Sequence, residues 1–153
     1  MTDPDEELLL GLLNSTPVVD GRPQDLLTTD AGERPALVRA RDLLQSVVRG
    51  DGDASLLQEL LVGVTWTASV GPRGIERVLR TTGTNPSVVR AVLAWDTLER
   101  ERPGRLRPCA NSECRLFFVD RSRAGTGRWC SMAVCGNRMK ARRHHSRVSS
   151  QDA

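Results

Sequence analysis

Residues 105–147 read RLRPCANSECRLFFVDRSRAGTGRWCSMAVCGNRMKARRHHSR. This stretch contains all four cysteines of the 153-residue chain, which are Cys109, Cys114, Cys130 and Cys135. Their spacing is C-x4-C-x15-C-x4-C, two equal pairs separated by a segment that is long enough to fold as a hairpin. Such a hairpin would bring four thiolates to one point, so the spacing predicts a structural metal site.

Four cysteine ligands in a closed tetrahedron favour one structural Zn²⁺ per chain, because no coordination position stays open for a substrate. Iron in a rubredoxin-like site is the alternative that the same sulfur set would accept. A redox dithiol fits less well, since such pairs usually have C-x-x-C spacing. His144 and His145 could in principle replace a ligand, but we expect them on the solvated part of a helix, well beyond Cys135.

The segment between the cysteine pairs predicts a local fold. Residues 115–120 are apolar and aromatic like a first strand, residues 122–127 resemble a turn, and Arg128-Trp129 lead into Cys130. Ser131 can cap a helix that runs through Cys135 towards Arg147. We therefore expect a treble-clef or ribbon-like finger made of a hairpin plus a helix. At least two of its three aromatic residues are expected to form its core, with base stacking as the alternative use of Phe117, Phe118 and Trp129.

On a wheel of 100° per residue, Met132, Cys135 and Met139 share the face that we expect to turn towards the metal. Basic residues surround the rest of this helix and continue onto the predicted hairpin turn. Such a surface favours nucleic-acid binding over a merely solvated face. The candidate nucleic-acid contacts are Arg121, Arg123, Arg128, Asn137, Arg138, Lys140, Arg142, Arg143 and Arg147.

Charge is divided unevenly along the chain. Residues 1–99 hold 9 arginines and 15 acidic residues, whereas residues 100–153 hold 13 basic and 4 acidic residues. The net charge of +3 therefore hides an acidic front and a basic back, as expected when one end of a protein meets a polyanion. Codon bias can explain why arginine replaces lysine, but not why positive charge gathers at one end.

The first hundred residues predict a mainly helical module. Helices are expected over residues 3–14, 35–49, 53–62 and 86–102, although a short strand over 8–13 is an alternative to the first. Residues 14–29 are predicted as loop. Alternation over 64–70, a Gly-Pro-Arg-Gly turn and a second run over 75–81 predict a β-hairpin. The fold class is thus mainly α with one small hairpin, divided into a module over 1–103, a finger over 104–148 and a disordered tail over 149–153.

No catalytic arrangement is apparent in this module. Its acids, such as Asp20, Asp25, Asp30 and Asp42, are scattered, and no histidine precedes residue 144, so we do not expect an enzyme. Trp66 and Trp95 are expected in the core rather than in the wall of a ligand pocket. No run approaches the roughly 18 apolar residues of a membrane helix, and we expect a soluble, cytoplasmic protein. No long linker precedes Cys109, so the base of the finger should pack on the module.

The string CRLFFVDRSRAGTGRWCSMAVCGNRMKARRHHSR closely resembles the CGNR zinc-finger family of bacterial proteins. The family takes its name from the tetrapeptide found here as Cys135-Gly136-Asn137-Arg138. The paired cysteines, the aromatic-Asp-Arg-Ser segment, Trp-Cys-Ser-Met and the basic tail all occur in order over some forty residues. The resemblance implies an N-terminal ABATE domain and a role as a stress-induced transcriptional regulator.

Together these features predict a zinc-finger DNA-binding protein that regulates transcription and associates with the nucleoid. The alternative is a zinc-stapled protein-interaction module, or an RNA binder, without a direct role on DNA. Its basic helix would then meet an acidic partner or the acidic front half of its own chain.

Overall fold

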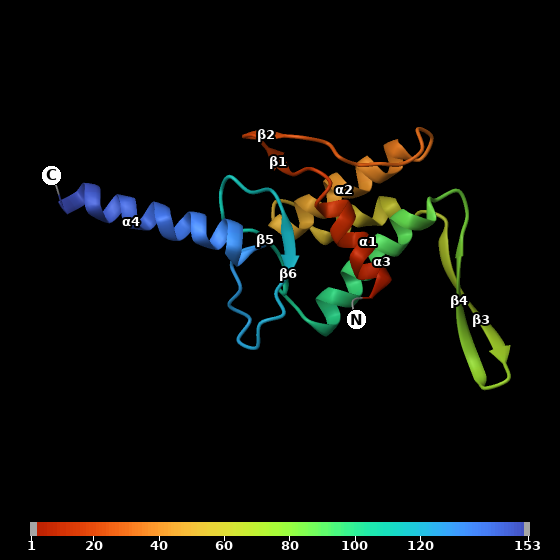
Figure 1. Cartoon of the computed structure of the whole chain (residues 1–153). Coiled ribbons are helices and arrows are strands. Elements are labelled where there is room, and N and C mark those ends of the chain that lie inside the picture. The colour runs from red at the N-terminus through yellow and green to blue at the C-terminus, as the bar shows by residue number, and fades with distance from the viewer. Residues whose placement is uncertain (1–2, 152–153) are drawn as a thin grey trace.

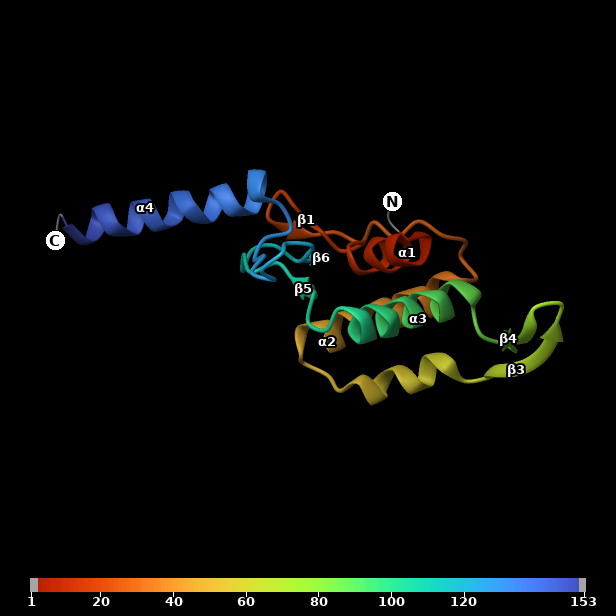
Figure 2. The same cartoon turned by 90° about the horizontal axis from the view of Figure 1, so that it is seen from below.

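The computed structural model describes residues 3–151, with side chains as far as Arg147. The first hundred residues form a helical module built from α1 (Pro4–Leu13), α2 (Arg34–Arg49), the 3₁₀ helix η1 (Ala54–Leu61) and α3 (Pro86–Glu101). α1 packs on one side of α2 and α3, and η1 packs on their other side (Figure 2). The strands of the described part pair as three separate two-stranded antiparallel sheets.

The helices begin and end where the sequence predicts. The Asp3 carboxylate accepts the N–H of Asp5 at 2.9 Å, and the Asn85 side chain accepts the N–H groups of Ser87 and Val88. Gly50 ends α2 in the left-handed conformation with φ at 81°, where glycine carries no Cβ penalty. Residues 3–14 are therefore helix rather than strand, and the predicted helix near 53–62 is present but is wound as a 3₁₀ helix.

The core of the module extends into the finger. Leu9, Leu13 and Leu44 are fully buried at its centre. Leu106 and Phe117, which flank the first cysteine pair, belong to the same hydrophobic cluster. The base of the finger is thus packed on the module, as the missing linker led us to expect.

The segment 14–29, which we predicted as loop, contains a small hairpin of β1 (Val18–Val19) and β2 (Arg22–Pro23). Asp20 and Gly21 form its turn with φ of 49° and 75°. An Asp-Gly pair with two positive φ angles makes a two-residue hairpin turn. The prediction of plain loop was therefore wrong, because the Asp-Gly turn allows the residues on its two sides to pair as strands.

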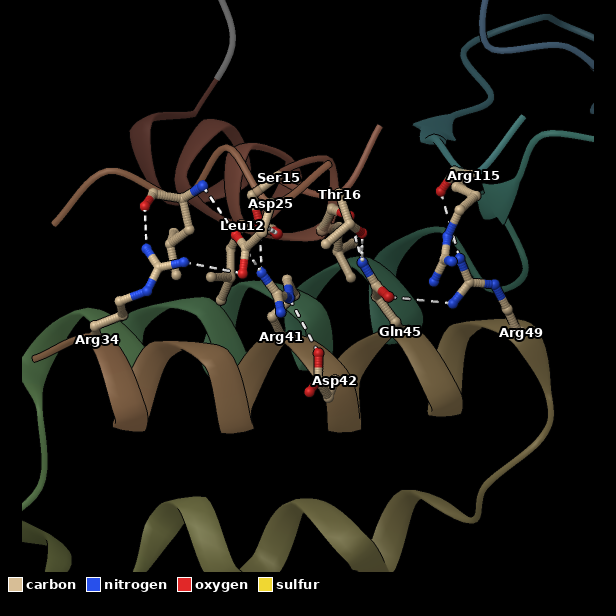
Figure 3. Close-up of polar contacts among 12 residues, drawn as sticks. Leu12, Ser15, Thr16, Asp25, Arg34, Arg41, Asp42, Gln45, Arg49 and Arg115 are labelled. Atoms are coloured by element: carbon tan, nitrogen blue, oxygen red, sulfur yellow. Dashed lines mark hydrogen bonds and ion pairs between the residues drawn. The ribbon is translucent and has the colours of Figure 1, made fainter. Parts of the chain in front are cut away.

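Side chains of α2 hold this segment in place (Figure 3). Buried Arg41 donates to Asp25 at 2.9 Å, and buried Gln45 donates to Oγ1 of Thr16 at 2.9 Å and to the carbonyl of Leu13, just before the segment, at 2.8 Å. The acid Asp25 therefore serves to fix the loop. Burial disfavours its ionisation, but the Leu27 N–H and Arg41 outweigh that effect and lower its pKa.

The predicted hairpin consists of β3 (Val64–Gly71) and β4 (Gly74–Thr81), and we call residues 64–81 the arm. The arm projects from the end of the helical module and lies clear of the helices in both views (Figures 1 and 2). Trp66 is 58% exposed, so the expectation that it lies in the core was wrong. Trp95 does pack against the core, partly buried.

At the opposite end of the molecule, α4 (Asn137–Gln151) projects away from the finger (Figure 1). This helix continues past the expected start of the tail at residue 149, and residues 152–153 lie outside the described residues. Within residues 3–151, no helix combines the length and apolar character that crossing a membrane requires.

Candidate metal centre

The four cysteine sulfurs converge at the junction of the finger and α4. All four Sγ atoms lie within 4.8 Å of one another. The Sγ atom of Cys130 is 3.7 Å from those of both Cys114 and Cys135. A tetrahedral zinc ion with Zn–S bonds of about 2.3 Å separates its sulfur ligands by about 3.8 Å. The cluster therefore fits one zinc ion in both donor type and spacing.

The first cysteine pair lies in the turn between β5 (Leu106–Pro108) and β6 (Phe117–Val119). The N–H of Cys109 donates to the carbonyl of Leu116, and the N–H of Cys114 donates to that of Asn111, both at 2.8 Å. We had predicted a hairpin between the two cysteine pairs, and this was wrong. Residues 106–108 pair with β6 instead, because burial of Leu106 and Phe117 in the core brings these two strands together.

The return from β6 to Cys130 is a loop organised by Asp120 rather than a strand. The buried carboxylate of Asp120 accepts the N–H of Ser122 at 3.0 Å and that of Gly127 at 2.9 Å. Hydrogen bonds from Ser122 are the largest cause that lowers the pKa of Asp120, and Arg105 adds to the effect. The N–H of Ala110 then donates to the carbonyl of Arg128 at 2.8 Å, which brings the chain back beside the first cysteine pair.

The second cysteine pair is shaped by a turn of π-helix, η2 (Met132–Gly136), before α4 begins. Ser131 caps this turn, as predicted, by accepting the N–H of Val134 at 3.3 Å. A wheel of 100° per residue does not apply to a π-turn, which has more residues per turn. Met132 is accordingly 55% exposed, whereas Cys135 is buried; the prediction that Met132 faces the metal was wrong.

Two side chains approach Gly136 of the Cys-Gly-Asn-Arg tetrapeptide closely. A Cβ atom there would lie 2.8 Å from the sulfur of Met132 and 3.2 Å from Cδ1 of Trp129. These two side chains therefore close over the backbone of the motif. A larger residue at 136 would have to displace Met132 or Trp129 from this contact.

Asn111 is a residue of the metal centre that the cysteine spacing did not reveal. It is 0% exposed, and its Nδ2 donates to Sγ of Cys135 at 3.4 Å. Its Oδ1 accepts the N–H of Glu113 at 3.2 Å. Asn111 thus shapes the first cysteine turn and contacts a ligand from the second, as partners of metal ligands commonly do. The sequence signal was an asparagine inside a short turn, a residue that often bonds the backbone two positions on.

The thiols differ in how easily they ionise. Burial raises the pKa of Cys114 and of Cys130. Burial acts in the same direction on Cys135, but hydrogen bonds from Asn111 and the neighbouring thiols outweigh it and lower the pKa. A zinc ion would have to displace protons from the thiols of Cys114 and Cys130, so zinc binding should weaken as the pH falls.

Polar contacts join the finger to the module. Asn14, at the end of α1, accepts the N–H of Phe117 at 2.7 Å and donates to its carbonyl at 3.1 Å. Buried Glu6 accepts from Arg102 at 2.9 Å and also pairs with Arg121. The guanidinium of Arg49 lies 4.5 Å from the centre of the Phe117 ring. These contacts hold the finger at a fixed position on the end of the module.

The predicted nucleic-acid contacts fall into two groups. Some are already engaged within the protein: Arg121 pairs with Glu6, Arg142 pairs with Glu113, and Asn137 donates to the carbonyl of Ala133 at 3.2 Å. Arg128 lies 5.0 Å over the ring of Trp129. The others are exposed, in the loop or along α4, and are Arg123, Arg138, Lys140, Arg143 and Arg147. His144 and His145 are exposed as expected and lie outside the sulfur cluster.

A cavity of about 820 Å³ opens beside the metal centre, between the β1–β2 turn and the finger. Cys114, Cys130 and Cys135 lie in its wall. Cys114 and Cys130 are only half-buried, so reagents in solution can reach the cluster from this side.

The site so described is a four-cysteine finger whose ligands could hold one zinc ion. The family model of the CGNR zinc finger matches residues 105–148, and this segment is therefore a CGNR zinc finger, as its tetrapeptide indicates. A comparison with curated proteins gave no match. The matched range contains all four cysteines and the described basic residues of α4.

Proposed function

We propose that the protein binds duplex DNA through its finger and α4, and that it acts as a regulator of transcription at the nucleoid. The observation that carries the proposal is the form of α4. The helix leaves the metal centre as a free-standing rod (Figure 2), and its 15 residues extend for about 22 Å. The major groove of DNA admits a helix of this kind.

The charges of α4 support this role. Arg138, Lys140, Arg143 and Arg147 are exposed, and α4 has no acidic residue. At 100° per residue these four side chains spread over more than one side of the helix, so they can reach the phosphates on both walls of a groove. The acidic module would repel DNA, so contact would be confined to the finger end.

The root of α4 is fixed to the metal centre. Arg142, one turn into the helix, pairs with Glu113 of the first cysteine turn. That hydrogen bond is the main cause that lowers the pKa of Glu113, and the charge of Arg138 adds to it. Arg142 therefore serves to orient α4 in this proposal, while the other four exposed basic residues of α4 contact phosphate. The finger would be treble-clef-like, with one cysteine pair in a strand turn and the other at a helix start.

The proposed role is binding and not catalysis, because four cysteines would fill the coordination shell of zinc. Arginine–base contacts would give sequence preference if Arg138 or its neighbours reach base edges. A basic helix could also bind RNA or an acidic protein, and Arg121 already meets the acidic module through Glu6. Binding measurements with DNA, RNA or an acidic protein as the probe distinguish these alternatives.

The test is fluorescence anisotropy of the zinc-loaded protein with labelled duplex DNA at several salt concentrations. We expect affinity to fall steeply with salt, and Lys140→Gln with Arg143→Gln and Arg147→Gln to reduce the slope of log K against log salt by about 3, roughly one for each lost phosphate contact. Arg90→Gln with Arg100→Gln is the control for loss of positive charge away from the finger, since both residues lie on α3 and pair with acids of the module, Asp5 of α1 and Asp96 of α3.

The control should bind as the unaltered chain does. Absence of salt-dependent binding to duplex DNA would disprove the proposal. Stronger binding to single-stranded RNA of equal length would identify RNA, instead of DNA, as the ligand. Genome-wide occupancy then tests the regulatory part of the proposal.

A further inference from the structure

One face of the arm is mainly apolar, and its outer part is exposed. The strand register pairs Val64 with Thr81, Trp66 with Leu79, Ala68 with Arg77, and Val70 with Ile75. Paired residues of an antiparallel hairpin share a face. The other face carries Thr65, Thr67, Ser69, Glu76, Val78 and Arg80. The arm is thus amphipathic, like a strand pair that covers a core, although the helical module does not lie under it.

The exposure of this face is large. Val70 is 84% exposed and Ile75 is 78% exposed, at the tip, and Trp66 lies exposed near the middle. A two-stranded hairpin alone is only marginally stable in water. Exposed apolar patches of this kind mark interaction sites. We therefore expect another protein surface to pack on the apolar face.

The two ends of the arm are complementary in charge, because the tip is basic and an acid lies near the base. The tip is the turn Gly71-Pro72-Arg73-Gly74, whose one charged residue is a basic one. The base carries a cavity of about 350 Å³ lined by Val62, Thr82 and Asn85, among others. Glu33 adjoins this cavity through Asn85, which donates to its carboxylate at 3.2 Å, and Thr29 donates to the same carboxylate at 3.3 Å. Glu59 in the cavity wall is paired with Arg39, whereas Glu33 has no arginine or lysine partner among residues 3–147, so its charge can still meet a new basic partner.

We propose that the apolar face of the arm is a dimer interface, on which the arm of a second copy of this chain packs face to face and antiparallel. A two-fold axis brings each tip to the base of the other arm, so that Val70 and Ile75 reach Val64 and the cavity beside Val62. Arg73 of one copy then approaches Glu33 of the other. Two sheets of this kind pack about 10 Å apart with interdigitated side chains.

The one charge on the apolar face agrees with this arrangement. Antiparallel packing about the middle of the arm sets the pair Trp66–Leu79 against the pair Ala68–Arg77 of the second copy. Arg77 then lies within reach of the second Trp66 ring, where a guanidinium is stabilised. The dimer would carry its two α4 helices at opposite ends, because α4 and the arm lie at opposite ends of each chain (Figure 1).

The test is sedimentation velocity of the full-length, zinc-loaded, nuclease-treated protein over a range of concentrations. We expect a monomer–dimer equilibrium for the unaltered chain. Val70→Glu with Ile75→Glu should raise the dimer dissociation constant at least about 100-fold, because four carboxylates would enter one symmetric interface. Thr67→Glu with Ser69→Glu places the same charge on the opposite face of β3 and should leave the constant within about threefold.

A charge-reversal pair tests the antiparallel register. Arg73→Glu should weaken the dimer by about tenfold, and Arg73→Glu with Glu33→Arg should restore it. Circular dichroism confirms that each variant is folded, and no altered residue belongs to the hydrophobic core. A monomer at all concentrations, or equal weakening by the two double-glutamate variants, would overturn the proposal. A dimer that forms as tightly with Val70→Glu and Ile75→Glu would also overturn it.

Discussion

The helical module and the finger are stabilised by different means. The module buries a cluster of leucines and valines contributed by four helices. The finger buries few apolar side chains between Cys109 and Cys135, and its chain is held by the cysteine cluster, by Asp120 and by Asn111. From this difference we expect the module to fold by the hydrophobic effect alone and the finger to require its metal.

The two regions are nevertheless joined at one strand. Phe117 lies in the core of the module and carries the Asn14 hydrogen bonds and the Arg49 contact. Cys114 is only three residues away along the chain. The position of α4 therefore depends on the metal for its rigidity and on the module for its direction.

Zinc removal tests the comparison most strongly. Structural zinc contributes about 10–16 kcal/mol in small fingers, so a chelator or Cys130→Ser should unfold residues 109–136 while α1, α2 and α3 remain folded. Hydrogen exchange followed by mass spectrometry would show fast exchange in the finger alone, and metal analysis should find one zinc per folded chain. Simultaneous loss of protection in the module would show that the two regions form one cooperative unit.

Asn14→Ala tests the joint between the regions. The substitution leaves the N–H and carbonyl of Phe117 without their side-chain partner, which should cost about 1–3 kcal/mol of unfolding free energy. Urea denaturation of the zinc-loaded protein measures this change. Asn14→Asp is the informative companion, because a carboxylate can accept from the N–H of Phe117 but cannot donate to its carbonyl. If neither variant changes stability, the strand is held by Phe117 burial alone.

Asp120→Asn tests the internal order of the finger and should have the smallest effect. The pKa of Asp120 is lowered by hydrogen bonds from Ser122 and Gly127 and by Arg105, so its carboxylate stabilises the folded loop above the pKa of an unfolded aspartate. That stabilisation is lost as the pH falls from about 4 through the lowered folded value.

The measured quantity for Asp120 is the difference in melting temperature between the unaltered chain and Asp120→Asn. This difference should be full at pH 7 and shrink below about pH 4. Asp30→Asn, in an exposed loop, is the control for a general effect of charge. A difference that stays constant down to pH 3 would show that Asp120 acts by shape and not by charge.

Much of the fold could be predicted because its signals are local. The cap at Asn85, the glycine at position 50 and the alternation of β3 and β4 each act within a few residues, and the elements they bound appear where the sequence predicts them. The winding of η2 could not be predicted, because it depends on how the second cysteine pair meets the first. The same is true of the pairing of β6 with residues 106–108 instead of 128–129.

The sequence by itself identified the four cysteines that could hold a metal ion, because two equally spaced pairs are the strongest set of metal donors that it contains. It also determined that positive charge gathers in α4. The tertiary structure decided which basic side chains pair within the protein, because Arg121 of the loop after β6 and Arg142 of α4 meet acids that lie far away in the chain or across the metal centre. It also decided that Trp66 is exposed on the arm, because alternation shows that a strand has an apolar face but not what covers that face.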